Sequence, residues 1–194
     1  MTQGHDPVTT DAGRGAVYSP TARALHWITV AAVFVMIPLG LAMTYRGNTL
    51  DIWDGVTDAL YSTHKLIGFL ILWLSAGRLI YRLVHGAPPD EPTLEWWQKA
   101  ASHLLHWALY GLLLIVPLLG WTGVSLFPAL TIFNLFDLPA LTAPNEEAAK
   151  RVLFIHGWIA IALALSVCGH IGAALFHYFI RKDGVLRRML PGLK

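Results

Sequence analysis

Long apolar stretches, separated by short polar segments, make up most of the chain after about residue 20. A helix that crosses a bilayer needs about 20 apolar residues, and four stretches meet this requirement. We predict membrane-spanning helices at residues 24–45, 60–83, 102–126 and 152–178. The fourth helix lies in an uncharged stretch between Arg151 and Arg181. The pattern predicts an all-α integral membrane protein, a four-helix bundle in a single domain (residues 21–194) after a flexible polar tail (residues 1–20).

The third helix is expected to fill only part of its apolar stretch. Residues 100–136 carry no charge, which is more than one span requires. We place the helix at 102–126 and predict that residues 127–141 form an apolar loop at the membrane interface. Pro128 and Pro139 interrupt this loop, and proline disfavours a continuing helix because it lacks a backbone N–H.

Composition and charge agree with a membrane protein. Hydrophobic residues make up 55% of the chain and charged residues only 13%, whereas a soluble domain has roughly 25% charged residues. The net charge is +2, which gives no indication of a nucleic-acid partner. We expect membrane lipid to surround the helices.

The distribution of Lys and Arg predicts the orientation of the bundle. Four spans place both termini on one side of the membrane, and cytoplasmic loops are enriched in positive charge. The side of the termini carries ten such residues, namely Arg14, Arg23, Arg78, Arg82, Lys99, Arg181, Lys182, Arg187, Arg188 and Lys194. The other side carries four, namely Arg46, Lys65, Lys150 and Arg151. Both termini are therefore predicted to be cytoplasmic.

Four histidines fall at paired depths on these helices. His156 and His170 are fourteen residues apart, so their rings project from nearly the same helix face, about 21 Å apart along the axis. In the predicted orientation, His26 begins the first span on the cytoplasmic side and His64 begins the second on the outer side. We therefore predict an outer pair, His64 with His156, and an inner pair, His26 with His170.

Paired imidazoles at these depths suit two stacked b-type haems. Two axial histidines leave no open position on the iron, which favours electron transfer over oxygen binding. A single membrane histidine can instead hydrogen-bond a neighbouring helix, but two pairs at matching depths favour haem. His106 on the third span is an alternative inner ligand to His26. Its other interpretation is a hydrogen-bonding or quinone-side residue.

Three further residues are candidates for shaping the haem sites. Gly40 lies fourteen residues after His26 and Gly68 one turn after His64, and glycine lets a large planar ligand approach the backbone. Arg78 lies fourteen residues after His64, at the depth of the inner haem. It can bind haem propionates or extend to the interface as an ordinary snorkelling side chain, and both alternatives stay open.

These residues and their neighbours resemble the bacterial cytochrome b561 family of four-helix di-haem proteins. The resemblance covers roughly residues 18–192. The matching segments are Tyr18-Ser19-Pro20, Leu25-His26-Trp27, Tyr45-Arg46-Gly47, His64-Lys65-Leu66-Ile67-Gly68, Arg78-Leu79 with Arg82, His103 to His106, His156-Gly157, His170 to Tyr178, Lys182-Asp183 and Met189-Leu190-Pro191. The resemblance implies two haems b, with His26, His64, His156 and His170 as axial ligands. It also implies ubiquinone as electron acceptor and a place in the bacterial inner membrane.

The resemblance further implies superoxide oxidation as one activity, in which an electron taken from superoxide outside the membrane reduces quinone. Superoxide is an anion and is attracted by positive charge, so Lys65 and Arg151, beside the outer ligands, are candidates for steering it. Both are also explained as interfacial anchors. Quinone is expected either at an inner cluster of His103, His106 and Arg82 or at an outer pocket formed by Trp121 and the apolar loop.

Two other classes of protein remain as alternatives. The chain could be the haem-bearing membrane anchor of a partner dehydrogenase or hydrogenase, passing electrons to quinone. Its short loops offer little docking area, which favours a self-contained oxidoreductase. It could also be a non-haem membrane protein with structural histidines.

Overall fold

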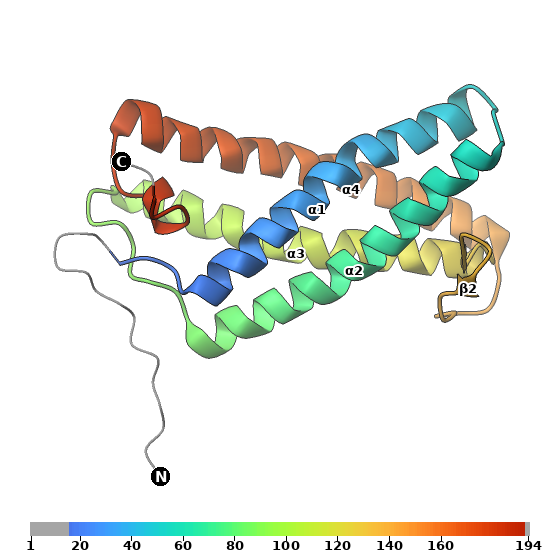
Figure 1. Ribbon diagram of the computed structural model, residues 1–194, viewed down its shortest axis with the longest axis horizontal. Helices are drawn as coiled ribbons and strands as arrows, with labels where there is room; N and C mark the ends of the chain where they lie inside the picture. Colours follow the sequence, from blue (N-terminus) through green and yellow to red (C-terminus); the bar gives the residue numbers. More distant parts are fainter. Residues whose placement is uncertain (1–15, 193–194) are drawn as a thin grey trace, which may run out of the picture.

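Four long helices form most of the computed structural model, which describes residues 16–192 (Figure 1). They are α1 (Pro20–Thr44), α2 (Gly55–His85), α3 (Trp96–Leu126) and α4 (Glu146–Phe176). All four are long and apolar enough to cross a membrane. The prediction of an all-α four-helix membrane bundle is therefore confirmed. Most of the predicted tail, residues 1–20, lies outside the described part of the chain.

Short turns of other helix types extend or follow the long helices. A π-helical turn, η1 (Tyr45–Thr49), continues α1, and a second one, η2 (His177–Arg181), continues α4. A 3-10 turn, η3 (Leu186–Arg188), follows near the C-terminus. With the two π-helical turns included, the four helical segments are residues 20–49, 55–85, 96–126 and 146–181. Each predicted span falls within one of them.

Polar side chains cap the N-termini of the helices, at positions that the apolar pattern alone does not identify. The Ser19 hydroxyl accepts from a free N–H of α1, with Pro20 in the first turn, a favourable N-terminal combination. Asn145 caps α4 in the same way. Glu95 and Gln98 form a reciprocal capping box at the start of α3. These caps satisfy N–H groups that a helix leaves without partners.

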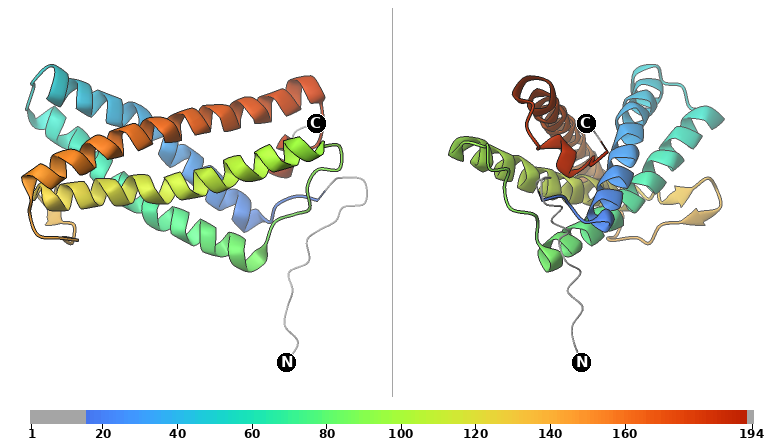
Figure 2. Two further views of the ribbon diagram at one scale, coloured as in Figure 1. Left: turned by 180° about the vertical axis from the view of Figure 1, so that it is seen from behind. Right: turned by 60° about the vertical axis from the view of Figure 1, so that its left-hand side comes forward.

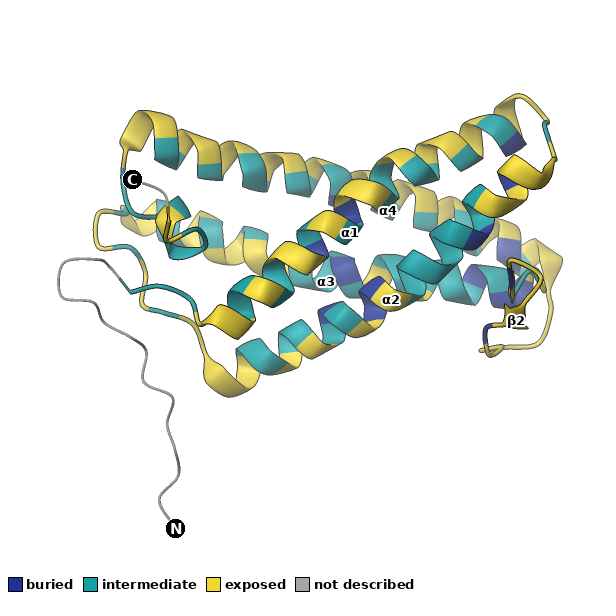
Figure 3. Ribbon diagram, viewed as in Figure 1, coloured by how far each residue is buried: buried dark blue, intermediate teal, exposed yellow. Residues whose placement is uncertain are grey.

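The helices pack chiefly in two pairs, α1 with α2 and α3 with α4, and α2 joins the pairs through α3. The right-hand view of Figure 2 shows the two pairs side by side. Dark blue positions in Figure 3 mark buried residues, which are few and lie mainly where the helices approach one another. Many large apolar side chains point outward and are exposed, as is required of a surface in contact with lipid.

One small core lies midway along the bundle. It contains one buried residue from each helix, Val33, Ile71, Leu113 and Leu163. Seven residues separate Val33 from His26, Ile71 from His64, and Leu163 from both His156 and His170. Seven residues span about 10 Å of helix, so this apolar layer lies between the depths of the two histidine pairs.

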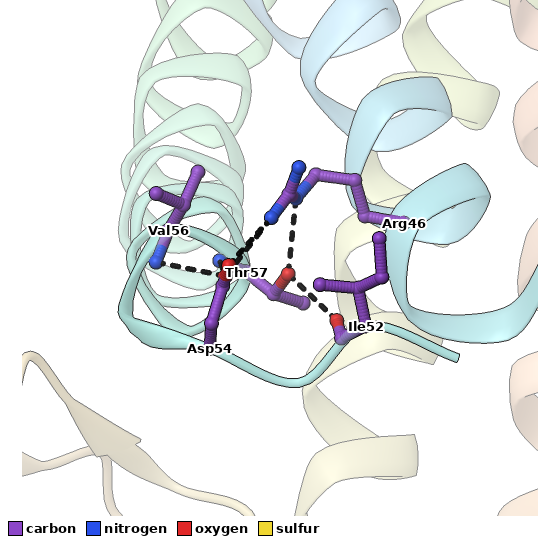
Figure 4. A network of polar contacts seen from close by, with 5 residues as sticks. All are labelled: Arg46, Ile52, Asp54, Val56 and Thr57. Carbon is purple, nitrogen blue, oxygen red and sulfur yellow. Dashed lines mark hydrogen bonds and ion pairs between the residues drawn. The ribbon is translucent and has the colours of Figure 1, made fainter. Parts of the chain in front are cut away.

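The connection between α1 and α2 is held by a network around Arg46 (Figure 4). Its Nη2 donates to both carboxylate oxygens of Asp54, at 3.0 and 2.8 Å, and its Nε donates to Thr57 Oγ1 at 3.1 Å. Asp54 also accepts from the N–H groups of Val56 and Thr57 at the start of α2. Hydrogen bonds from the Thr57 N–H and from Arg46 hold the pKa of Asp54 below its ordinary value.

A short β-hairpin interrupts the segment that was predicted as an apolar loop. β1 (Thr131–Ile132) pairs antiparallel with β2 (Phe136–Asp137), and Phe133 and Asn134 make the turn with positive φ. The sequence analysis predicted no strand here. The hairpin and the α1–α2 connection lie at the same end of the bundle (Figure 1), which we call the hairpin end.

The opposite end, called the C-terminal end, is closed by the chain after α4. The Asp183 carboxylate, 5% exposed, accepts from His177 Nδ1 at 2.6 Å. The guanidinium of Arg188 donates to the carbonyl of Ala16 at 2.9 Å and also to that of Pro89. The C-terminal segment therefore joins the start of the described chain, the α2–α3 connection and α4.

Candidate functional site

The four histidines singled out by spacing form two pairs in the structure. His64 on α2 lies beside His156 on α4, with ring centres 6.2 Å apart and ring planes at 84°. His26 on α1 lies beside His170 on α4, with ring centres also 6.2 Å apart and planes at 73°. Helix α4 thus contributes one member to each pair. The His64/His156 pair lies toward the hairpin end and the His26/His170 pair toward the C-terminal end.

The ring separation within each pair suits one metal between the rings. Imidazole nitrogen binds a metal at roughly 2 Å, so the centres of two rings on opposite sides of a metal are about 6 Å apart. His106, the alternative partner of His170, has its ring centre only 5.2 Å away, which is too close for that arrangement. Its Nδ1 donates to the carbonyl of Ser102 at 2.6 Å, which leaves Nε2 available, so the choice between the two residues depends on the ring separation alone. The geometry therefore favours His26 over His106 as the partner of His170.

Two histidines at each site suit a metal whose other ligands come from a cofactor. Within residues 16–192, no group of three or more His, Cys, Asp or Glu side chains is placed to hold a bare metal ion. Two histidines are instead enough for a metal that a porphyrin ring already holds. The residues present therefore fit haem better than a free ion.

The contacts of the ring nitrogen Nδ1 differ between His64 and His156. His156 Nδ1 donates to the carbonyl of Val116 on α3 at 2.9 Å. Such a bond fixes the tautomer of a ligating histidine and leaves Nε2 for the metal. His64 Nδ1 is buried and has no hydrogen-bond partner in the described part of the chain. The orientation of His156 is thus set by α3, whereas that of His64 depends on packing.

Glycines let both rings of this pair lie close to helix backbones. A Cβ added at Gly40 would lie 3.3 Å from His64 Cε1, and one at Gly120 would lie 3.1 Å from His156 Cε1. The spacing of Gly40 from His26 marked it as a candidate, whereas no spacing in the sequence indicated Gly120. At Gly68, the other candidate, an added Cβ would make only an ordinary contact of 3.5 Å with Met36.

A cavity of about 1320 Å³ surrounds the His64/His156 pair. Ligand pockets commonly measure about 300–1,000 Å³, so this one has room for a large cofactor. Its lining includes Gly40, Gly68, Lys65, Trp121 and Phe133. The predicted outer quinone pocket, between Trp121 and the apolar loop, is therefore part of the same cavity.

Arg78 is engaged inside the bundle, next to the other pair. Its Nη2 donates to His26 Nδ1 at 2.9 Å, and its guanidinium lies 5.3 Å from the centre of the Tyr110 ring. A guanidinium can only donate, so Nδ1 is the acceptor and a neutral ring carries its proton on Nε2. Metal binding through Nε2 instead places the proton on Nδ1. Arg78 must therefore give up this bond when His26 is a ligand.

The other polar residues predicted near this pair do not form one cluster. His103 Nε2 pairs with Asp90 at 3.0 Å, and this hydrogen bond holds the pKa of Asp90 below its ordinary value. His106 lies beside His170 instead. Arg82, one turn after Arg78, has a buried Nη1 without a hydrogen-bond partner among residues 16–192.

Most cations at the hairpin end are neutralised by carboxylates. The ion pairs are Arg46 with Asp54, Lys150 with Glu146 and Arg151 with Glu147. Lys65 instead donates to the carbonyl oxygens of Ala129 and Thr131, at 2.9 and 2.5 Å. Of the two predicted steering residues, Lys65 lines the cavity, whereas Arg151 is 74% exposed and paired along α4.

The Lys65 contacts also anchor the hairpin to α2. A second anchor is Ser62, whose hydroxyl accepts from the N–H of Phe133 at 3.1 Å. This role of Lys65 and Ser62 could not be predicted from the sequence, because their partners are backbone groups 64 to 71 residues away. The hairpin is therefore fixed beside the cavity rather than loosely attached.

Comparisons with known proteins identify relatives along nearly the whole chain. The family described as "Prokaryotic cytochrome b561" matches residues 17–192. "Cytochrome b561 homolog 1" of Escherichia coli (strain K12) is 33% identical over 182 residues, 91% of this chain and 98% of that protein. "Cytochrome b561 homolog 2" of the same organism is 30% identical over 174 residues, 89% of this chain and 90% of that protein. A more distant relative, "Probable superoxide oxidase CybB" of Yersinia pestis, is 23% identical over 174 residues, 90% of this chain and 96% of that protein.

Proposed function

The chain belongs to the prokaryotic cytochrome b561 family, and from this premise we propose that it carries electrons from superoxide to ubiquinone through two haems b. Family membership makes it a membrane haem protein of the electron-transfer class. The observation that carries the proposal of two haems is the pair of sites, each with ring centres 6.2 Å apart. They lie at different depths of one bundle, so that together they bridge the membrane.

His64 and His156 would hold one haem, and His26 and His170 the other. When bound, haem supplies an iron that accepts and releases single electrons, and two histidine ligands leave it no open position. The carbonyl of Val116 keeps the His156 ring in the tautomer that binds through Nε2. The apolar layer between the sites excludes water from the middle of the bundle.

We place the hairpin end outside the cell and the C-terminal end in the cytoplasm of a bacterial inner membrane. The excess of Lys and Arg on the side of the termini supports this orientation. The His64/His156 site is then the outer one and receives electrons. The His26/His170 site is the inner one.

Superoxide as the donor is supported by the printed name of one relative and by Lys65. The ammonium group of Lys65 has no carboxylate partner in the described chain and lies at the cavity, so it attracts a small anion. Arg151 contributes less, because Glu147 offsets its charge. Each superoxide gives up one electron and becomes dioxygen. Two electrons and two protons convert ubiquinone to ubiquinol.

For ubiquinone, we favour the C-terminal end, beside the His26/His170 site, because electrons that enter at the outer site then pass both histidine pairs before they reach their acceptor. His106, whose ring centre lies 5.2 Å from that of His170, and Arg82, whose buried Nη1 has no hydrogen-bond partner among residues 16–192, are polar groups at this end. The pocket beside Trp121 belongs instead to the cavity that surrounds His64 and His156. A ubiquinone or inhibitor bound at the hairpin end would contradict this choice.

The two-haem proposal is tested by the haem content and visible spectra of purified variants. His64→Ala or His156→Ala should remove one haem and keep the other, and His26→Ala or His170→Ala should do the reverse. His106→Ala is the matched control and should keep both haems. If it loses the inner haem while His26→Ala retains it, the inner pairing is wrong. Wild-type protein without b-type haem absorption would overturn the proposal.

The donor is tested by stopped-flow mixing of oxidised protein with superoxide. Electrostatic steering changes association rates by about tenfold or more, so Lys65→Gln should slow haem reduction several-fold and Arg151→Gln much less. The rate should fall as salt rises, because screening limits surface charge to about 8 Å at physiological ionic strength. Reduction by a neutral quinol should change little. Rapid reduction by a partner dehydrogenase without any response to superoxide would favour a membrane-anchor function.

A further inference from the structure

The two histidine sites have different electrostatic surroundings. We infer that Arg78, together with Arg82, makes the His26/His170 site the stronger electron acceptor and so directs electrons toward it. This inference rests on the proposed two-haem function and names the residues that give the transfer its direction. It depends on the charges near each histidine pair and on the groups that contact the Nδ1 atoms of the histidines.

The first observation is an unbalanced positive charge at the His26/His170 site. Arg78 touches His26 and lies over Tyr110, and Arg82 is one turn away on α2 with a buried, unpartnered Nη1. Among residues 16–192, neither arginine forms an ion pair with a carboxylate. Charges interact strongly away from water. Two arginines here therefore favour the state of the site that holds one more electron.

The second observation is that the His64/His156 site has less positive charge beside it. Lys65 is the cation next to this pair, and its ammonium donates to two carbonyl oxygens. The field at this site is therefore less positive than the field at the other pair.

The third observation concerns the ligands themselves. His156 donates from Nδ1 to a backbone carbonyl, which makes the imidazole a stronger donor to its metal and favours the oxidised state. At the other pair, the bond from Arg78 to His26 Nδ1 is given up when His26 is a ligand, so it does not act on the ligand in the haem-loaded protein. No carbonyl or carboxylate accepts from His26 or His170 within the described chain. Both effects therefore separate the sites in the same direction.

With haem bound at both sites, one electron would leave the His64/His156 site, which would be oxidised, and enter the His26/His170 site, which would be reduced. No bond forms or breaks and no proton is needed for this step. Haem reduction potentials respond to nearby charge, hydrogen bonding to the ligands and burial. Arg78 is a positioning residue in this scheme, because it acts through the field at the ligand rather than on substrate.

The test is a potentiometric titration of purified haem-loaded protein, with each haem identified by the single-haem histidine variants. The higher of two midpoint potentials should belong to the His26/His170 site. Arg78→Gln should lower that potential and leave the other in place. Arg78→Lys should retain most of the difference, because it keeps the charge. Arg187→Gln removes an exposed charge from the same end of the bundle and should change neither potential.

Other outcomes would overturn either the inference about Arg78 or the proposed two-haem function. A higher potential at the His64/His156 site, or an equal shift of both potentials in Arg78→Gln, would overturn the inference while leaving the two-haem proposal intact. If Arg78→Gln does not retain the inner haem, Arg82→Gln decides, since a lowered inner potential supports the inference and an unchanged one overturns it. Wild-type protein with fewer than two haems would instead overturn the proposed function.

Discussion

The surroundings of the two ring nitrogens of a buried histidine decide which nitrogen can bind a metal. For His156, contacts with α3 fix the orientation of the ring. Its Nδ1 donates to the Val116 carbonyl, and its ring lies against Gly120. A buried polar group without a partner is costly, so the carbonyl bond stabilises the ring in one orientation. That orientation leaves Nε2 for a ligand.

Adding a side chain at Gly120 should therefore disturb one haem site only. A Cβ there would lie 3.1 Å from His156 Cε1, and the methyl groups of Gly120→Val would add to the overlap. We expect this variant to lose most of the haem that we propose for His64 and His156 and to keep the haem proposed for His26 and His170, as measured by haem content and spectra. Gly111→Val is the matched control on α3, because nothing lies within 4 Å of an added Cβ there. Two haems in Gly120→Val would mean that the ring can move without loss of ligation.

The residues of the site differ in how far the sequence could reveal them. Spacing was enough to pair His26 with His170 and His64 with His156, because the helical repeat and the span ends convert residue number into depth and face. It did not reveal Gly120 or Val116. Their contacts depend on how α3 is rotated against α4, and a helix that is apolar on every side carries no periodic signal for its rotation.

At the scale of elements, the apolar runs predicted the spans well but not the helix ends. α2 begins at Gly55 and α3 at Trp96, five and six residues before the predicted starts, because Asp54 and Glu95 cap N–H groups beyond the apolar runs. The hairpin was missed for a different reason. Strands of two residues within an apolar loop show no alternation of apolar and polar positions.

The Asp54 cap should make the stability of the hairpin end depend on acid. Its pKa in the folded protein is below the ordinary 3.8, because the Thr57 N–H and Arg46 stabilise the carboxylate. A group whose pKa is lowered by folding contributes stability above its unfolded pKa, and this is lost as pH falls through the folded value. Below about pH 4, the thermal midpoint of the wild type should therefore fall toward that of Asp54→Asn.

The measurement is the unfolding midpoint of detergent-solubilised protein at a series of pH values. The difference between wild type and Asp54→Asn should be largest near neutral pH and shrink in acid. Arg46→Gln removes one of the two stabilising partners and should show part of the same effect. Parallel curves for wild type and Asp54→Asn would mean that the network contributes nothing through this carboxylate.

The stability of the C-terminal end should depend on the hydrogen bonds of Asp183. Its carboxylate, 5% exposed, accepts from His177 Nδ1 at 2.6 Å and from the N–H of Val185 at 3.1 Å. Loss of a buried hydrogen bond to a charged group costs about 2 kcal/mol. Asp183→Asn should therefore speed amide hydrogen exchange in residues 182–190. Lys182→Gln, at an exposed neighbour, should not, and unchanged exchange in both would show that other contacts hold this segment.

At the scale of the whole molecule, the bundle is two sites separated by an apolar layer. One buried side chain from each helix forms that layer, and each of the four histidines is seven positions along its helix from the layer residue of that helix. The sequence contained this arrangement as a repeat of seven along α1, α2 and α4. The direction in which the bundle crosses the membrane depends on a different feature of the sequence, the number of Lys and Arg residues on each side.

The orientation can be tested by labelling single cysteines in intact cells with a membrane-impermeant maleimide. The background is Cys168→Ser, since Cys168 is the one cysteine of the chain. Thr142→Cys, exposed in the connection between the hairpin and α4, should be labelled from outside. Arg187→Cys, exposed at the C-terminal end, should be labelled only after the membrane is made permeable, because positively charged loops are retained in the cytoplasm. The reverse pattern would place the His64/His156 site inside the cell, where Lys65 would face cytoplasmic rather than external superoxide.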